Sequence, residues 1–379
     1  MIHRPEACAT RGFGTATTAS RRRRVIILAT AAACLLGADA WVRETKSSLD
    51  PFYIDRYRRK LAAIMAEPGE AQILLMGSSR ARYALVPEEF RRITGLRAFN
   101  FGVPASKPIE WQWMARNGIR TARPRLVVLG VNASAIRADY LPVPAARNLF
   151  TLKDFLSYCR TDGWSGELAS HYLDRNVLSV WALLHRRFEV KMLVQKQLGG
   201  ILPKYAQQAI EREAMASKPC PPDGFEHPWL AGRRLKNLGL WIEDDPKSIT
   251  AANPPPFSEQ APALSHFEKL LEWCIEQRVP LVVAYLPNSP ATEDRWRDVE
   301  PQMQAAIASA CRAHGIPFLP CDQRTIPRTD YDYIEEMHTG LPLARRISRR
   351  IARFIRARGL LDASSEKLAS LPEEETNAP

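Results

Sequence analysis

Cysteine is scarce in this chain, with 7 residues in 379, and no two cysteines have the CxxC spacing typical of zinc ligands or redox pairs. Cys8 and Cys34 lie near the N-terminus, which leaves an odd number for the rest of the chain. Neither a zinc site nor a disulfide framework is predicted. Cys274 and Cys311 fall within helical hydrophobic patterns, where a free cysteine behaves as a small apolar residue. We expect both to lie in the core.

The sequence also lacks the short motifs that bind common cofactors. It contains no HExxH, no Walker motif and no dinucleotide fingerprint that follows a strand. Asp330 and Asp332 form an isolated Asp-x-Asp, which by itself is a weak indication of a metal site. We therefore expect no cofactor and no metal.

Acidic residues are too few to balance the basic ones, and the formal net charge is +12. Such a surplus can indicate nucleic-acid binding. However, residues 1–24 hold six arginines and one glutamate, so five of these charges lie in a terminal segment rather than on a folded surface. No motif that reads RNA or DNA is present, and nucleic acid is not expected as a partner.

Long hydrophobic runs are absent except near the N-terminus. Four arginines at 21–24 precede an uncharged run of 14 residues, Val25 to Ala38. This length is closer to the apolar part of a signal peptide than to a full membrane span, and Ala38-Asp39-Ala40 offers a cleavage site. Residues 1–42 are therefore predicted to be a signal peptide or an N-terminal membrane anchor. Either way, the remainder is expected in the cell envelope, on the periplasmic or extracytoplasmic side.

The rest of the chain alternates between short apolar runs and helical patterns. Strands are predicted at 73–76, 98–101, 125–132, 280–286 and 316–320, and helices at 53–67, 87–93, 107–122, 263–278, 297–314 and 341–358. Alternation of this kind implies a parallel, doubly wound sheet with right-handed crossovers. The predicted fold class is therefore α/β, with five parallel strands between two layers of helices.

Two segments break this alternation. Residues 140–260 contain a helical pattern and two proline clusters, and we interpret them as a mainly helical insertion between the third and fourth strands. Residues 363–379 are polar and acidic and are predicted to be a disordered tail. The predicted globular domain thus spans residues 43–362.

Chemically capable residues follow several of the predicted strands. Ser78 and Ser79 come after the first strand, Asn100 and Gly102 after the second, and Asn132 after the third. In open α/β sheets, ligands bind beyond the carboxyl ends of the strands. A serine at such an edge is a candidate nucleophile, although a serine pair can also simply cap the helix that follows.

A candidate base lies just before the last predicted helix. His338 is preceded by Glu335, and Asp332 and Glu336 are close by in sequence. A serine, a histidine and a carboxylate are the parts of a nucleophile–base–orienter triad. A glycine N–H and an asparagine amide at neighbouring strand ends are the donors that an oxyanion hole would use.

The ordered blocks "MGSSR", "NFG", "GVN" and "EEMH" resemble the motif series of the SGNH (GDSL-type) hydrolases. The resemblance implies a flavodoxin-like α/β/α sandwich and a serine esterase or O-acyltransferase. It implies Ser79 as nucleophile, His338 as base and Glu335 as orienter. It further implies an oxyanion hole made by Ser79, Gly102 and Asn132.

The chain departs from the family pattern at three positions. Ser78 stands where the family has Asp, Ala133 follows Asn132 where many members have Asp, and Glu335 is one methylene longer than the usual Asp. Asp332 is the alternative orienter. The Gly-Ser-Ser variant is similar to membrane-anchored members that act on the cell envelope.

By this resemblance the expected function is to cleave or transfer an acyl ester, expected to be acetyl, on a glycan or polymer of the envelope. The expected partners are an acylated glycan or small acyl ester, and a membrane acyltransferase. A catalytically inactive domain that binds an envelope polysaccharide or such an acyltransferase is the alternative. The basic run at 344–358 is interpreted as a solvated helix face, with contact to anionic lipid or glycan left open.

Overall fold

The computed structural model describes residues 18–44, 52–104, 106–137, 152–176, 220–225, 253–334 and 337–361. The chain divides into two compact units, one of residues 1–50 with 174–200 and one of residues 51–173 with 201–379. The second unit contains the sheet and the candidate site.

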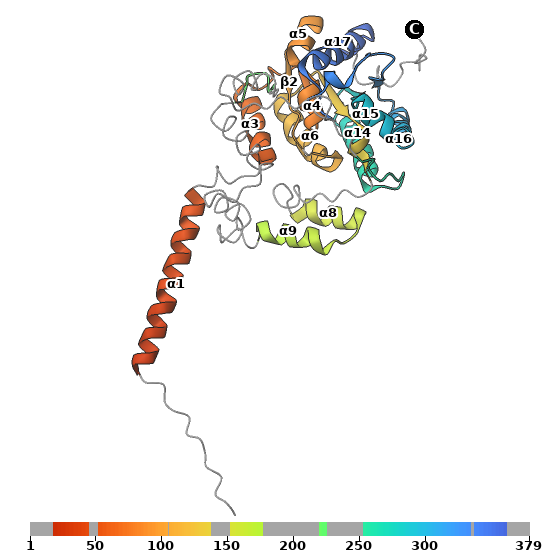
Figure 1. Cartoon of the computed structure of the whole chain (residues 1–379). Coiled ribbons are helices and arrows are strands. Elements are labelled where there is room, and N and C mark those ends of the chain that lie inside the picture. The colour runs from red at the N-terminus through yellow and green to blue at the C-terminus, as the bar shows by residue number, and fades with distance from the viewer. Residues whose placement is uncertain are drawn as a thin grey trace, which may run out of the picture. The chain divides into compact units, whose positions relative to one another are not determined.

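In the first unit, Thr18–Glu44 forms one helix, α1, drawn in red in Figure 1. Its apolar side chains between Val25 and Leu28 are 63–69% exposed. Within the described part of the chain, no helix combines the length and the apolar character needed to cross a bilayer. The predicted role of residues 1–42 as a signal peptide or anchor stays a prediction.

In the second unit, five parallel strands form one sheet in the order β2-β1-β3-β4-β5. This is the strand order of the flavodoxin-like sandwich, and it confirms the predicted fold class. Each strand lies within one of the five predicted runs or extends it by one residue. The strands are β1 (Ile73–Gly77), β2 (Ala98–Asn100), β3 (Leu126–Val131), β4 (Leu281–Tyr285) and β5 (Phe318–Pro320).

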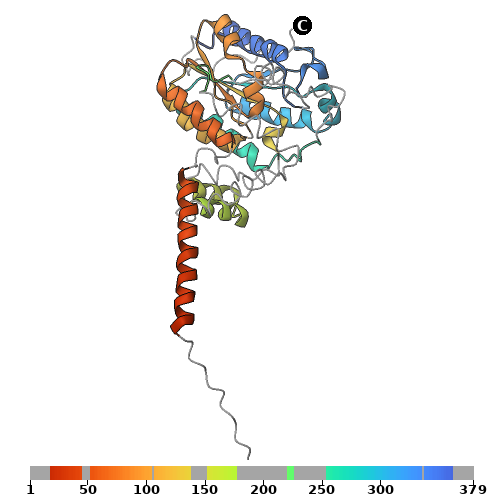
Figure 2. The same cartoon turned by 60° about the vertical axis from the view of Figure 1, so that its left-hand side comes forward.

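Side chains of each strand alternate between the two faces of the sheet, as the pleat requires. In β1, Leu74 and Met76 contribute to one hydrophobic cluster and Ile73 and Leu75 to the other. Helices cover both faces, which is why the strands are continuous apolar runs (Figures 1 and 2). The first cluster takes in α3 (Phe52–Ala66), α6 (Pro108–Ala122), α14 (Pro262–Glu276) and α16 (Glu300–Ala313); the second takes in α4 (Ser79–Ala84), α5 (Pro87–Thr94) and α17 (Leu341–Ala357).

The cysteines predicted for the core are found there. Cys274 in α14 is 1% exposed and Cys311 in α16 is 0% exposed. Both are free thiols, and burial raises the pKa of Cys274 to about 12. They act as small apolar residues in the layer that covers the first face of the sheet.

Several short elements were not predicted from the sequence. These are α4, which begins directly after β1, α15 (Pro290–Arg295), and the 3-10 turns η1 (Ala133–Ile136) and η4 (Asp330–Asp332). Segments of three to six residues are too short to show a hydrophobic period. The helix predicted at 297–314 begins only at Glu300.

Part of the predicted insertion between β3 and β4 is described. It forms α8 (Leu152–Asp162) and α9 (Gly166–Asn176), and the rings of Phe155 and Tyr172 stack with centroids 4.3 Å apart. Most of residues 140–260, and all of the predicted tail at 363–379, lie outside the described residues.

A buried carboxylate joins α5 to α17. The side chain of Glu89 is 6% exposed and accepts two hydrogen bonds from Arg349, each 2.9 Å long, and two from Arg92, of 2.7 and 3.0 Å. The hydrogen bonds from Arg349 are the main reason why the pKa of Glu89 is lowered. This ion pair fixes α17, the last helix, against α5.

We expect Glu89→Gln to lower the free energy of unfolding by about 1–3 kcal/mol at pH 7, because charge-assisted hydrogen bonds are lost. A lowered folded-state pKa stabilises the protein above the unfolded pKa of about 4.3, and this contribution is lost as the pH falls through the folded value. Urea unfolding of both proteins between pH 7 and pH 3 should therefore show the difference shrinking below about pH 4. An equal difference at all pH values would contradict the assignment.

Candidate active site

The candidate site begins where β1 ends on a glycine. Gly77 has a φ of +137° and pairs in register with Gly130 of β3. A Cβ on Gly77 would lie 2.7 Å from the Cβ of Ala81 and would also collide with the carbonyl oxygen of Gly130. Only glycine therefore lets the chain turn here from the strand directly into α4.

The two serines after Gly77 have different tasks. Ser78 has extended backbone angles and is the N-cap of α4, and its hydroxyl accepts a 3.3 Å hydrogen bond from the N–H of Arg80. Ser79 is the first residue of the helix. The alternative that a serine caps the following helix thus holds for Ser78, and it leaves the hydroxyl of Ser79 for another partner.

That partner is His338. Its Nε2 lies 2.8 Å from the Oγ of Ser79, although the two residues are 259 positions apart in the chain. This is the length of a good hydrogen bond between a hydroxyl and an imidazole. The ring of Tyr83, one helical turn after Ser79, meets the imidazole edge-on, with centroids 4.7 Å apart and an interplanar angle of 89°. Two residues of α4 thus contact the histidine ring, Ser79 at its Nε2 and Tyr83 through its aromatic ring.

Backbone contacts on either side of His338 fix its position. Tyr333 and Thr339 form an isolated antiparallel bridge, and the N–H of Ile334 donates a 2.8 Å hydrogen bond to the carbonyl of His338. The hydroxyl of Tyr333 donates to the backbone carbonyl of Asn288, which follows β4. The position of the imidazole is therefore tied to the edge of the sheet.

The two carboxylates predicted to orient His338 have different outcomes. Glu335 lies outside the described residues, so its predicted role stays a prediction. Asp332 is occupied elsewhere: one oxygen accepts from Arg346 at 2.6 Å, and the other accepts from the N–H of Thr329 at 2.9 Å. Because both of its oxygens serve the η4 turn and α17, Asp332 is not supported as the orienter.

Asn132, directly after β3, is 2% exposed. In the amide orientation that satisfies its neighbours, the oxygen accepts from the N–H of Ser134 at 3.1 Å, the Oγ of Ser134 at 2.7 Å and the Nε of Arg80 at 3.2 Å. The NH₂ group is then turned to the opposite side of the amide. The contact with a guanidinium polarises the amide and makes that NH₂ a stronger donor.

The backbone N–H of Gly102, predicted to be an oxyanion-hole donor, has another partner in the structure. Its N–H donates a 3.0 Å hydrogen bond to the Oδ1 of Asn100, and an added Cβ would lie 2.6 Å from the backbone nitrogen of Arg82. Glycine is required here because the loop after β2 passes close to α4. Since this N–H is already paired, the predicted oxyanion-hole role of Gly102 is not supported, and Ser79 and Asn132 remain as predicted donors.

Asn100 connects the loop after β2 to α4 through its side chain, a role that was not predicted from the sequence. Its Nδ2 donates to the carbonyl oxygens of Ala81, Arg82 and Leu85 at 2.6–3.2 Å, at the end of the helix that begins with Ser79. Lys60 of α3, which is 0% exposed, donates to the backbone carbonyls of Asn100 at 2.7 Å and Gly102 at 2.9 Å. Together these bonds fix α4 against the loop after β2.

A second buried polar group holds the other side of α4. Arg80 is 5% exposed and donates to the Oδ1 of Asn288, whose backbone carbonyl accepts a 3.3 Å hydrogen bond from Arg328. Arg328 is 4% exposed and pairs with Glu293 of α15. The residue after the candidate nucleophile is therefore anchored to the loops that follow β4 and β5.

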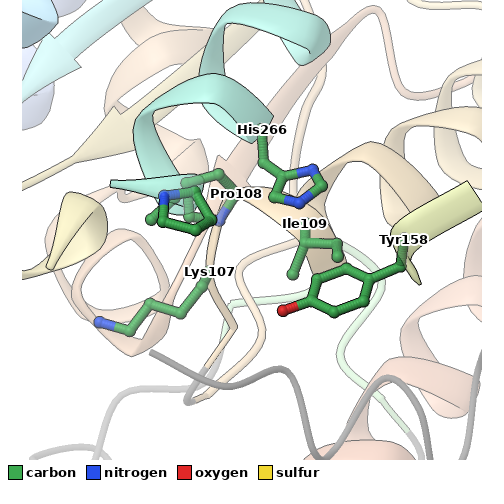
Figure 3. Close-up of a pocket in the computed structure, with 7 residues that line it drawn as sticks. Lys107, Pro108, Ile109, Tyr158 and His266 are labelled. Carbon is green, nitrogen blue, oxygen red and sulfur yellow. The ribbon is translucent and has the colours of Figure 1, made fainter. Parts of the chain in front are cut away.

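Two of the cavities that the described residues line lie near this edge of the unit, and the Ser79–His338 pair lines neither of these two. A cavity of about 340 Å³ beside Arg328 is lined by Tyr285, Glu293 and Glu300 among others. A smaller pocket of about 10 Å³ lies between Lys107, Tyr158 and His266, with the last two rings stacked (Figure 3). It has room for about one water molecule, which is too little for a substrate.

The carboxylates of the Asp-x-Asp at 330–332 accept hydrogen bonds from the backbone of neighbouring segments. The Oδ1 of Asp330 accepts a 3.1 Å hydrogen bond from the N–H of Ala291 at the start of α15. Among the residues that the structure describes, no group of three or more His, Cys, Asp or Glu side chains is arranged to hold a metal ion.

No protein-family model matches this chain, and no curated protein sequence matches it. Function is therefore inferred from the site, because a fold alone does not determine an activity.

We expect Lys60→Met to lower the free energy of unfolding by about 2–4 kcal/mol, because the methionine fills the space but leaves two buried carbonyls without a donor. Chemical denaturation measures the change. Arg58→Met, at an exposed position of the same helix, is the matched control and should change stability by less than about 1 kcal/mol. Equal stability of the two variants would show that the ammonium group does not hold the loop.

Proposed function

We propose that this protein is an exported serine esterase or O-acyltransferase of the SGNH type, acting on an acyl ester of a cell-envelope glycan or polymer. The observation that carries the proposal is the 2.8 Å contact between the Oγ of Ser79 and the Nε2 of His338. A serine hydroxyl paired with an imidazole at the carboxyl edge of a parallel sheet is the arrangement that activates a nucleophile.

In the proposed mechanism, the Nε2 of His338 accepts the proton of the Ser79 hydroxyl while the oxygen attacks the carbonyl carbon of the ester. The imidazolium then donates this proton to the departing alkoxide, which leaves as an alcohol. The acyl group stays on the enzyme as an ester of the Ser79 Oγ. Water or a sugar hydroxyl attacks the acyl-serine while His338 accepts its proton. The bond between the acyl group and the Ser79 Oγ then breaks, and the imidazolium returns the proton to that oxygen. Hydrolysis and transfer differ only in this second acceptor.

Two groups are proposed to stabilise the oxyanion that forms during attack. One is the backbone N–H of Ser79, which as the first residue of α4 has no partner within the helix. The other is the NH₂ group of Asn132, whose oxygen is held by Arg80 and Ser134. Glu335 is proposed to orient the imidazole by accepting a hydrogen bond from its other nitrogen.

The location and the acceptor are supported by the sequence. The arginine cluster at 21–24 and the apolar run after it favour export or anchoring in the envelope. An envelope polymer, with acetyl as the expected acyl group, follows from the likeness of Gly77-Ser78-Ser79 to envelope members of the superfamily. An acyltransferase in the membrane is the proposed donor for transfer.

Replacing Ser79 with Ala, or His338 with Ala, should lower turnover of p-nitrophenyl acetate by on the order of 10³–10⁶, because the two groups act as a unit. The double variant should lose no more than either single variant. Ser78→Ala is the matched control, because it removes a neighbouring hydroxyl that only caps the helix. It should cost about 1 kcal/mol of stability and keep most of the activity.

A fluorophosphonate probe distinguishes the enzyme from the inactive binding domain. Labelling of folded wild-type protein and of Ser78→Ala, but not of Ser79→Ala, is the expected result. Absence of labelling and of ester turnover in folded wild-type protein would favour the domain that only binds a polysaccharide or an acyltransferase.

We expect Asn132→Ala to lower kcat by roughly 10²–10³ with little change in KM, because an oxyanion donor acts mainly in the transition state. Steady-state kinetics with a soluble acetyl ester measures both parameters. Labelling of Ser79 by the phosphonate, read in parallel, shows that the nucleophile is still in place. Unchanged kcat would remove Asn132 from the mechanism.

A further inference from the structure

An arginine-rich surface covers the layer formed by α5 and α17, which lie side by side (Figure 1). The two helices contain eight arginines and two glutamates, a surplus of six positive charges. Of the two glutamates, Glu89 is buried and is shared by Arg92, Arg345 and Arg349. The solvent therefore meets mainly guanidinium groups.

Four of these arginines form one row along α17. Arg345, Arg349, Arg353 and Arg356 are spaced by four, four and three residues, which places them on one face of a helix. At a rise of 1.5 Å per residue the row is about 16 Å long, with one guanidinium for about each turn. Arg345, Arg353 and Arg356 are exposed, and Arg349 is partly so. Among the described residues, no carboxylate pairs with Arg353 or Arg356.

The row lies on a rigid base. The opposite face of α17 is fully buried through Leu343, Ile347, Ile351 and Ile355, which pack in the hydrophobic cluster beneath the sheet. The backbone positions that carry these guanidinium groups are therefore held at a constant spacing before any partner binds. Such preorganisation lowers the entropy cost of binding a repeating ligand.

A lipid bilayer fits this surface less well than a soluble polymer. A helix that lies in a membrane interface inserts an apolar face, but the apolar face of α17 is already used in the core. Among the described residues, no large hydrophobic side chain of α5 or α17 is exposed. The surface therefore has positive charge that can bind an anionic ligand, but no exposed large apolar side chain that could insert into a bilayer.

We propose that this arginine row is a docking surface for a linear, carboxylated polysaccharide. Arginine binds carboxylate through two parallel hydrogen bonds. The distance between successive arginines, about one helical turn, is close to the length that each pyranose unit adds to an extended polysaccharide. The choice of a polysaccharide rather than another polyanion rests on the proposed function. Docking on α17 would hold an acidic envelope glycan on the helix that directly follows His338.

The test is binding of full-length protein to polygalacturonate, measured by biolayer interferometry at several salt concentrations. Arg353→Gln combined with Arg356→Gln should weaken binding at least 10-fold and reduce the dependence of log Kd on log salt, because two ion contacts are removed. Arg120→Gln combined with Arg312→Gln removes the same charge from exposed positions on α6 and α16 and should change Kd less than twofold. Equal weakening in both double variants would overturn the proposal, because net charge alone would then explain binding.

Two further measurements separate this proposal from its alternatives. Ser79→Ala should bind the polymer as wild-type does, and the Arg353/Arg356 variant should hydrolyse p-nitrophenyl acetate normally, so that failure of one proposal is distinguishable from failure of the other. Binding to phosphatidylglycerol vesicles but not to polygalacturonate would assign the surface to a membrane and overturn the proposal. Dextran, which carries no charge, should not bind.

Discussion

The close packing of α4 on the ends of β1 and β3 is the constraint on which the site depends. It requires two glycines that face each other in register, Gly77 and Gly130, because a side chain on Gly77 would collide with Gly130 and with Ala81. With this contact, the chain leaves β1 and enters α4 within one residue. Ser79 is thereby placed on the carboxyl edge of the sheet, where loops from other strands can reach it.

The site is held by polar groups that are removed from solvent. On one side, Lys60 and Asn100 fix the loop after β2 to the end of α4. On the other side, Arg80 is anchored through Asn288 to the loops after β4 and β5. Buried polar groups of this kind are costly unless every partner is present, so they specify one arrangement of loops. A serine–histidine pair needs that precision more than it needs additional stability.

The proposed catalytic pair and the proposed docking surface lie in different parts of one unit. The serine–histidine pair lies at the strand ends, and the arginine row lies along α17, which begins three residues after His338. Glu89 connects the two regions, because it joins α17 to α5 and α5 follows α4 closely in the chain. A polymer held on α17 would thus bind to a helix that is joined, through Arg346, to Asp332 in the segment before His338.

The sequence by itself determined the fold. Five apolar runs separated by helical patterns predict a parallel sandwich, because burial on both faces requires continuous hydrophobic strands. The sequence also singled out Ser79, Asn132 and His338, since each follows or precedes a recognisable element. Helix α4 was missed because six residues carry too little periodicity.

Only the tertiary structure decided which of these groups meet. In the folded chain, Ser78 caps α4 and Ser79 contacts the imidazole of His338. The N–H of Gly102 donates to Asn100. Asp332 accepts hydrogen bonds from Arg346 and Thr329. Lys60 could not be identified from its sequence position, because a lysine on an amphipathic helix is ordinarily solvated. Hydrogen bonds between residues tens to hundreds of positions apart depend on loop paths, and no local pattern in the chain encodes them.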